Sequence, residues 1–293
     1  MFNLVIRNQT SPTPSRTRLG FGSISLALAA NLSSFATLAS DWSMVDRPTE
    51  GIPRSIGETN AGCIAGASNL PLEGKGYQVM HIERNRYWGH PDLVKAIRIL
   101  GQKSQQRALG VVQIGDLGQP RGGPLPYGHR SHQSGLDVDV WFNLDPKALA
   151  GANAMRNNIN APSMLNESKT GLDRDRWTAD HATLLELAAN LPGVDRIFVN
   201  PYIKKELCES VGGNRAWLRV IRPWYNHDDH FHLRLACPED SPNCKEQENI
   251  PPGEGCDSSL DWWFQHPTVT TPKPHPAPRP QLPEECKAVL VEP

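Results

Sequence analysis

Half of the ten histidines in this 293-residue chain fall in two short clusters. The clusters comprise His129 and His132, followed by His227, His230 and His232. An acidic residue, Asp139, lies seven residues after His132. Imidazole and carboxylate ligands together suit Zn²⁺ better than Ca²⁺ or Mg²⁺. Three protein ligands with the fourth position left to water are typical of a catalytic zinc site, so these residues indicate metal-assisted hydrolysis.

The second cluster has the alternation of a β-strand, in which every other side chain shares a face. His230 and His232 therefore point to the same side, opposite an apolar face. Residues 136–144 alternate in the same way and place Asp139 on the polar face. Two such strands side by side could present Asp139, His132 from the preceding loop, and one of the two strand histidines. Strand alternation alone does not decide which histidine binds the metal.

The elements that must position these residues are short and of mixed type. Alternation and helical periodicity predict strands at 77–82, 110–114, 136–144, 196–200 and 230–235, and helices at 91–109, 179–190, 201–209 and 215–222. Residues 41–75 are rich in Gly, Pro, Asn and Ser, and we expect an irregular arm there; we expect loops at 115–128 and 145–176. This order predicts one α+β domain with a small central antiparallel sheet flanked by helices and loops.

Composition limits the classes of partner. The formal net charge is −1 and the pI is about 6.8, whereas proteins that bind nucleic acid through counterion release are usually basic, so we expect no nucleic-acid partner. Apolar residues make up 38% of the chain and the mean hydropathy is −0.47, which is typical of a soluble globular protein. Nothing in the sequence defines the oligomeric state, and a homodimer is left open.

The first 40 residues have the features of a signal peptide. Three arginines precede an uncharged run of small and apolar residues at 19–39, and Thr37 and Ala39 suit the −3 and −1 positions of a cleavage site. The run is too weakly hydrophobic for a membrane anchor, so we expect no membrane span after cleavage. We expect a zinc metallopeptidase domain at 41–265 and a Pro-rich tail at 266–293.

Cysteine usage agrees with export. The chain has six cysteines, an even number, and all of them follow the predicted signal. An oxidising compartment would pair them as three disulfides, for which sequence alone permits 15 arrangements. None has the CxxC spacing of a zinc knuckle, so we do not expect cysteine ligands at the metal.

The longer context of both histidine clusters carries a resemblance to the LAS metallopeptidases, which include lysostaphin-type enzymes, D-Ala-D-Ala metallopeptidases and the hedgehog N-terminal fold. Residues 128–141, 196–201 and 221–235, together with the spacing of the cysteines, are similar more specifically to the penicillin-insensitive murein endopeptidases of the bacterial periplasm. The resemblance covers nearly the whole chain after the predicted signal.

The resemblance implies roles for individual residues. The implied metal ligands are His132, Asp139 and His232, with His129 placed beside this metal group, while His230 is the catalytic histidine and His227 lines the site next to it. The implied disulfides are Cys63–Cys286, Cys208–Cys256 and Cys237–Cys244. The implied cofactor is Zn²⁺, and the implied substrate is the D-alanyl–meso-diaminopimelate cross-link of peptidoglycan in the periplasm, cut without a serine nucleophile.

One stretch departs from the expected pattern, because the acidic pair Asp228 and Asp229 lies between His227 and His230. Acidic neighbours favour the charged form of a histidine. Family members can carry further Asp and His ligands in the 150–180 region, but His181 falls in a predicted helix and we assign it no ligand role. Three other functions stay open at this point: a zinc D,D-carboxypeptidase of the same fold, a non-catalytic zinc module that binds peptidoglycan, and a disulfide-rich structural domain.

Overall fold

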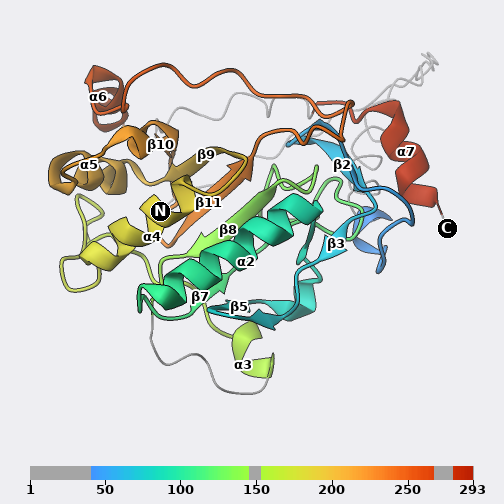
Figure 1. Ribbon diagram of the computed structural model, residues 1–293, viewed down its shortest axis with the longest axis horizontal. Helices are drawn as coiled ribbons and strands as arrows, with labels where there is room; N and C mark the ends of the chain where they lie inside the picture. The colour runs from blue at the N-terminus through green and yellow to red at the C-terminus, as the bar shows by residue number, and fades with distance from the viewer. Residues whose placement is uncertain (1–40, 145–152, 267–279, 293) are drawn as a thin grey trace, which may run out of the picture.

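A seven-stranded sheet lies at the centre of the computed structural model, which describes residues 41–144, 153–266 and 280–292 (Figure 1). The predicted signal at 1–40 lies outside these residues, as do parts of the predicted 145–176 loop and of the Pro-rich tail. In spatial order the strands are β10 (Ile221–Pro223), β9 (Val194–Val199), β11 (His230–Leu235), β8 (Asp137–Trp141), β7 (Val112–Ile114), β5 (Tyr77–Val79) and β4 (Glu73–Gly74).

The predicted α+β class is confirmed, and the sheet is larger than expected. Strands β9, β11, β8 and β7 pair antiparallel, as predicted, and form the middle of the sheet. On either side a parallel pair extends it, β10 with β9 and β5 with β7, so the whole sheet is mixed. Parallel neighbours need a crossover connection, and helices provide it here: α2 (Pro91–Gln106) joins β5 to β7, and α5 (Pro201–Ser210) lies between β9 and β10.

Helices α2 (Pro91–Gln106) and α4 (Ala179–Ala189) cover one face of this sheet (Figure 1). Helix α2 begins at a proline, and the Nδ1 atom of His90 accepts a hydrogen bond from the backbone N–H of Asp92. Helix α4 begins with a capping box, in which the N–H of Thr178 donates to Nδ1 of His181. The Nε2–H of His181 donates to the Phe142 carbonyl, so this histidine has a structural role away from the second cluster.

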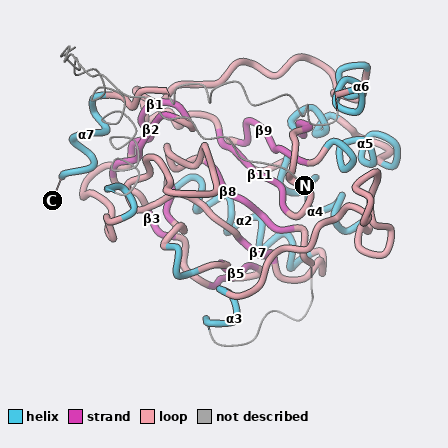
Figure 2. Tube along the Cα trace, turned by 180° about the vertical axis from the view of Figure 1, so that it is seen from behind, coloured by secondary structure: helices cyan, strands magenta, loops and turns pink. Residues whose placement is uncertain are grey.

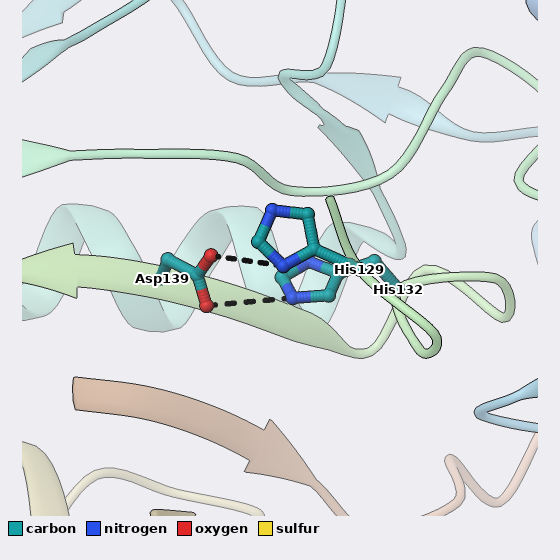
Figure 3. A group of neighbouring side chains, drawn as sticks. All are labelled: His129, His132 and Asp139. Atoms are coloured by element: carbon teal, nitrogen blue, oxygen red, sulfur yellow. Dashed lines mark ion pairs between the residues drawn. The ribbon is translucent and has the colours of Figure 1, made fainter. Parts of the chain in front are cut away.

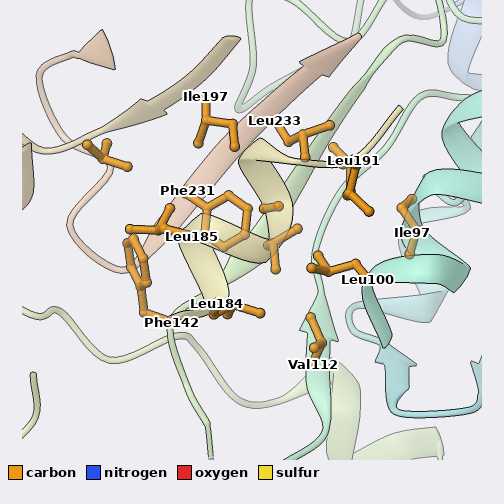
Figure 4. Close-up of a cluster of buried hydrophobic side chains, with 14 of the residues drawn as sticks. Ile97, Leu100, Val112, Phe142, Leu184, Leu185, Leu191, Ile197, Phe231 and Leu233 are labelled. Carbon is orange, nitrogen blue, oxygen red and sulfur yellow. The ribbon is translucent and has the colours of Figure 1, made fainter. Parts of the chain in front are cut away.

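The hydrophobic core fills the space between these helices and the sheet (Figure 4). Leucines of α2 and α4 contact the apolar faces of the central strands, where alternate residues are buried as the sequence predicts. The strand residues on this side are Val138, Val140, Phe231, Leu233 and Leu235. Because the apolar side chains occupy one face, the polar side chains of β8 and β11 are all on the other.

The N-terminal arm is more regular than expected. Residues 41–75 contain an antiparallel hairpin of β1 (Arg54–Glu58) and β2 (Ala61–Ala65), and β3 (Ser68–Asn69) pairs with β6 (Trp88–Gly89). The hairpin has a small core of its own, in which Trp42, Ile56 and Val289 are buried around a disulfide. Contacts with the distant C-terminal segment therefore stabilise strands that the local Gly- and Ser-rich composition does not indicate.

The helix expected at 215–222 is instead a short 3₁₀ helix, η2 (Ala216–Val220), followed by strand β10. Pro223 accounts for the extended end of this segment, because proline favours extended backbone in the preceding residue, Arg222. As the last residue of an edge strand, Pro223 also costs the sheet no internal hydrogen bond. The remaining elements are η1 (Ile82–Arg84), α3 (Asn153–Asn157), α5 (Pro201–Ser210), α6 (Ser258–Gln265) and α7 (Glu284–Val291).

All three predicted disulfides are present: Cys63–Cys286, Cys208–Cys256 and Cys237–Cys244. The first joins β2 to α7 and ties the C-terminal segment to the N-terminal hairpin, as expected. Within the described residues, no helix combines the length and the apolar character needed to cross a membrane.

We expect Leu233→Ala to lower the free energy of unfolding by about 2–5 kcal/mol, because the side chain is buried in the core and its removal leaves a cavity. Chemical denaturation measures this loss. The control is Ile52→Ala, since Ile52 is 74% exposed and its truncation should change stability by no more than about 0.5 kcal/mol. Equal stability of the two variants would contradict the assignment of the core.

Lys204 on α5 makes stability depend on pH. Its Nζ atom is buried and donates to the carbonyls of Leu218 and Glu254 at 2.7 and 2.6 Å. Burial and the nearby Arg222 lower the pKa of Lys204 to about 7. Between pH 7 and the ordinary lysine pKa of 10.5, the unfolded chain binds a proton that the folded chain does not, so stability rises with pH in this range.

We therefore expect Lys204→Met to remove most of this rise, because methionine fills a similar volume without a proton to release. Thermal unfolding between pH 7 and pH 10 measures the slope. The matched control is Lys205→Met on the same helix, whose exposed side chain should leave the slope as in the parent protein. The same slope in all three proteins would show that Lys204 stays charged when folded.

Candidate metal centre

The pairing of β8 with β11 brings the two predicted metal-binding segments together. In the observed register, His232 lies opposite Asp139 and Arg234 lies opposite Asp137. His230 lies opposite Trp141, one step further along the same polar face. The expectation from strand alternation thus agrees with the structure, and Asp139 faces both strand histidines.

The loop between β7 and β8 brings His129 and His132 to the same place (Figure 3). His132 has a left-handed backbone conformation with φ of 67°, which is uncommon outside glycine and is often found at functional sites. Its backbone N–H donates to Oδ2 of Asp137 at 3.1 Å. Gly118 packs against this turn, since a Cβ there would lie 3.0 Å from the His132 carbonyl oxygen.

Four imidazoles surround the carboxylate of Asp139. Oδ1 of Asp139 lies 3.4 Å from Nε2 of His132, 3.3 Å from Nδ1 of His232 and 3.6 Å from Nε2 of His230. Its other oxygen, Oδ2, lies 3.4 Å from Nδ1 of His129 (Figure 3). One carboxylate is therefore surrounded by both histidines of the first cluster and by His230 and His232 of the second.

The second ring nitrogen of each of these histidines donates to a separate acceptor. The acceptors are Asp116 for His129, the Leu117 carbonyl for His132, Asp229 for His230, and Asp137 for His232, at 3.0, 3.2, 2.5 and 2.7 Å respectively. Such outer contacts fix the tautomer and the ring orientation of metal-binding histidines. In its neutral form, each ring consequently directs its lone pair toward Asp139.

Lone pairs that face a carboxylate repel it unless a cation lies between them. The Nε2 atom of His132 and Oδ1 of Asp139 are both buried, and neither makes a hydrogen bond with any residue in the described part of the chain. Ligand atoms of His129, His132 and Asp139 all lie within 4.8 Å of one another, which is compatible with one metal ion. The residues present therefore fit a cation, and nitrogen and carboxylate donors fit zinc.

Burial divides the cluster into two groups. The side chains of His132, Asp139 and His232 are at most 6% exposed, whereas those of His129 and His230 are 23% and 22% exposed. The group whose ligand atoms all lie within 4.8 Å of one another, His129, His132 and Asp139, therefore combines two buried side chains with one that is partly exposed. The half-buried histidines lie at the rim, where a substrate can reach them.

Asp137, to which the sequence pattern assigns no role, is fully buried beneath the cluster. It accepts hydrogen bonds from Nε2–H of His232 and from Nε–H of Arg234, in addition to the backbone of His132. Burial alone would raise the pKa of Asp137, but Arg234 and His232 outweigh it and hold the pKa well below its usual range. Its place two residues before Asp139 on the polar face is the signal that could have identified it.

Asp116 is a second buried acidic residue beside the cluster that no sequence pattern identifies. It accepts hydrogen bonds from Arg84, Arg86 and His129, and its side chain is 2% exposed. Burial raises the pKa of Asp116, but His129 and the two arginines lower it further, to about 2. Asp116 thus stays charged and orients His129. It could not be identified from the sequence, because it lies in a Gly- and Pro-rich loop where residue patterns carry little information.

The pKa values of His230 and His227 are shifted in opposite directions. Burial lowers the pKa of His230, but Asp139 and Asp229 dominate together and raise it to about 9. Burial and the neighbouring charge of His230 lower the pKa of His227 to about 4. The acidic pair at 228–229 therefore favours a charged His230, whereas His227 stays neutral and its Nδ1–H donates to the Tyr225 carbonyl at 2.8 Å.

A cation site of histidines and a carboxylate, on the polar face of an α+β sheet, places the chain in the class of metallopeptidases. A family model described as penicillin-insensitive murein endopeptidase, peptidase M74, matches residues 55–291. Penicillin-insensitive murein endopeptidases of Salmonella paratyphi B, Salmonella heidelberg and Salmonella newport are each 44% identical over 265 residues, which is 90% of this chain and 96% of each relative. The chain belongs to the penicillin-insensitive murein endopeptidase family.

We expect Asp137→Asn to lower the affinity for Zn²⁺ by about 10- to 100-fold, because it weakens the contact that orients His232. Competition with a chelator of known affinity measures the change. The control is Asp175→Asn, an exposed carboxylate outside the cluster, which should leave the affinity unchanged. Thermal unfolding of the metal-free variant shows whether the fold survives, and a folded variant with unchanged affinity would refute the positioning role.

Proposed function

We propose that this protein is a zinc-dependent murein endopeptidase that hydrolyses the D-alanyl–meso-diaminopimelate cross-links of peptidoglycan in the periplasm. Membership of the family and the names of its relatives support the reaction and the substrate. The observation that carries the proposal is the buried carboxylate of Asp139, which is surrounded by histidine nitrogens and has an oxygen without a hydrogen bond within the described residues.

The ligands in this proposal are Nε2 of His132, a carboxylate oxygen of Asp139 and Nδ1 of His232. These are the atoms left free by the outer contacts to the Leu117 carbonyl and to Asp137, and their side chains are the most buried of the cluster. His129 completes the group at its exposed side, where Asp116 holds it.

Zinc bound at this site would polarise the scissile carbonyl and lower the pKa of water to about 7. The protein's own contribution lies with His230, which Asp229 holds at the rim of the cluster. In its charged form His230 donates a hydrogen bond to the oxyanion that develops on the scissile carbonyl, and in its neutral form it accepts the proton of the attacking water. Neither role uses a serine nucleophile.

His227 has a different part in this proposal. Its Nδ1–H is engaged by the Tyr225 carbonyl, so its neutral ring offers Nε2 as a hydrogen-bond acceptor beside His230, with 5.1 Å between the ring centroids. A neutral acceptor here can bind an amide N–H of the peptide substrate without adding to the positive charge of the site.

Three further features support the periplasm as the compartment. Disulfides persist in oxidising compartments, and this chain has three of them. The predicted signal at 1–40 supplies a route of export. Peptidoglycan, the proposed substrate, is found outside the inner membrane.

We expect His232→Ala to lose both bound zinc and activity, since it removes a ligand, and His230→Ala to keep zinc but lose turnover by about 100-fold or more. Elemental analysis of the purified protein measures zinc, and chromatography of muropeptides released from purified murein measures turnover. Full turnover in a zinc-free His232→Ala protein would disprove the ligand assignment.

Product analysis separates this activity from that of a carboxypeptidase. Mass spectrometry of a digested cross-linked muropeptide should show monomers that together retain every alanine of the dimer. Free D-alanine without loss of dimers would instead show that the enzyme trims uncross-linked stems.

A further inference from the structure

A row of aromatic side chains extends from the metal centre to the outer surface of α6. We call it the aromatic ledge, and it consists of Phe198, Trp224, Tyr225, Trp262 and Trp263. The ring of Phe198 lies 5.5 Å from that of His232 and also 5.5 Å from that of Trp224. Trp263 follows at 5.8 Å from Trp224, and Trp262 at 5.4 Å from Trp263.

Two rings of the ledge are exposed. Trp224 is 52% exposed and Trp262 is 48% exposed, which places them among the large apolar residues with the greatest exposure in the described chain. Single exposed apolar residues are common, but these two rings are joined through Trp263, and Trp224 is joined to the candidate site through Phe198. The rings thus form a contiguous apolar patch that begins at the site, and such patches mark binding sites.

The ledge is held in place by its neighbours. The hydroxyl of Tyr225 donates to the His266 carbonyl at 2.6 Å, and its ring packs 4.7 Å from Trp263. Helix α6 is capped by Asp257 and anchored by the buried Leu260, and the Cys208–Cys256 disulfide joins its start to α5. In Figure 1, α6 accordingly lies beside α5 and β10, at the same end of the sheet as β9. Little ordering is needed on binding, because the rings are already fixed.

We propose that the aromatic ledge binds the glycan strand to which the cleaved peptides are attached, with pyranose rings stacked on Trp224 and Trp262. This inference rests on the proposed function, because murein is the substrate that joins peptides to glycan. One face of a pyranose ring presents C–H groups that pack on an aromatic ring, and its hydroxyls lie at the edge, where an indole N–H can donate to them.

The position of the ledge fits the length of the substrate. A stem peptide of four residues spans at most about 14 Å when extended, so the sugar that carries it must lie close to the metal centre. The ledge begins at Phe198, in ring contact with the candidate ligand His232, and continues outward from there. The aromatic ledge thus continues the candidate site outward, in a direction that a bound glycan strand can follow.

The size of the ledge argues against a protein partner. Two half-exposed tryptophans supply apolar area on the order of 200 Å², whereas a stable protein interface needs about 800 Å² from each partner. The polar residues Asp257, Asp261 and Gln265 also interrupt the surface of α6. A few stacked sugar rings match this area better than a folded surface does.

The test compares two substrates that differ only in their sugars: a cross-linked muropeptide dimer with its disaccharides, and the same peptide dimer after the disaccharides have been removed. We expect Trp262→Ala to raise KM by about three- to tenfold on the first substrate, with kcat unchanged, and to leave both constants unchanged on the second. Trp262 has no contact with the histidine cluster, so it separates glycan binding from catalysis. Trp262→Tyr should restore most of the affinity, and Ile52→Ala serves as the exposed apolar control.

Direct titration with peptide-free glycan strands gives a readout that needs no turnover. Binding to the parent protein, three- to tenfold weaker binding to Trp262→Ala and recovery in Trp262→Tyr are the expected results. Equal KM values for parent and Trp262→Ala on the disaccharide-bearing dimer, or equal losses on both dimers, would overturn the glycan assignment while the endopeptidase function stands. A zinc-loaded parent protein that cleaves neither dimer would instead overturn the proposed function.

Discussion

In the centre of the sheet, Asp139 of β8 lies opposite His232 of β11, and this cross-strand pairing is the constraint on which the site depends. Side chains alternate along a strand, so a slip of one residue would turn Asp139 or His232 toward the core and break up the cluster of imidazoles around the carboxylate. The apolar residues on the opposite face prevent such a slip, because Phe231 and Leu233 would then face solvent. The same alternation therefore encodes both the hydrophobic core and the site.

Beneath this pair, a network of buried charges holds the ligands in orientations that are unfavourable without a cation. Asp137 binds His232, Arg234 and the backbone of His132. Its contact with His232, and that of the Leu117 carbonyl with the His132 ring, direct two lone pairs toward Asp139 in the neutral rings. Removing an unpaired group of this kind from water costs free energy, which an ion returns when it binds. An ion that binds only the folded chain would stabilise it by mass action, so metal binding at this cluster would be coupled to folding.

Much of the fold and of the site could be predicted from local patterns. The strand at 230–235 was predicted with its observed bounds, and alternation placed both of its histidines on the correct face. The β1–β2 hairpin was missed because its stability comes from α7, more than 200 residues away. Asp116 and Asp137 were missed for a similar reason, since a role as an outer partner is defined only by contacts that the folded chain creates.

The disulfide between Cys63 and Cys286 joins cysteines that are 223 residues apart in the sequence, and on the proposed export route this separation would affect the order of oxidation. A chain that crosses a membrane from its N-terminus presents Cys63 first and its partner last, with the other four cysteines in between. Cys63 must stay reduced through nearly the whole passage, or be released from a wrong pairing by thiol–disulfide exchange. On that route, maturation would require an oxidising environment that can also isomerise disulfides, and the N-terminal hairpin would be the last part to be covalently completed.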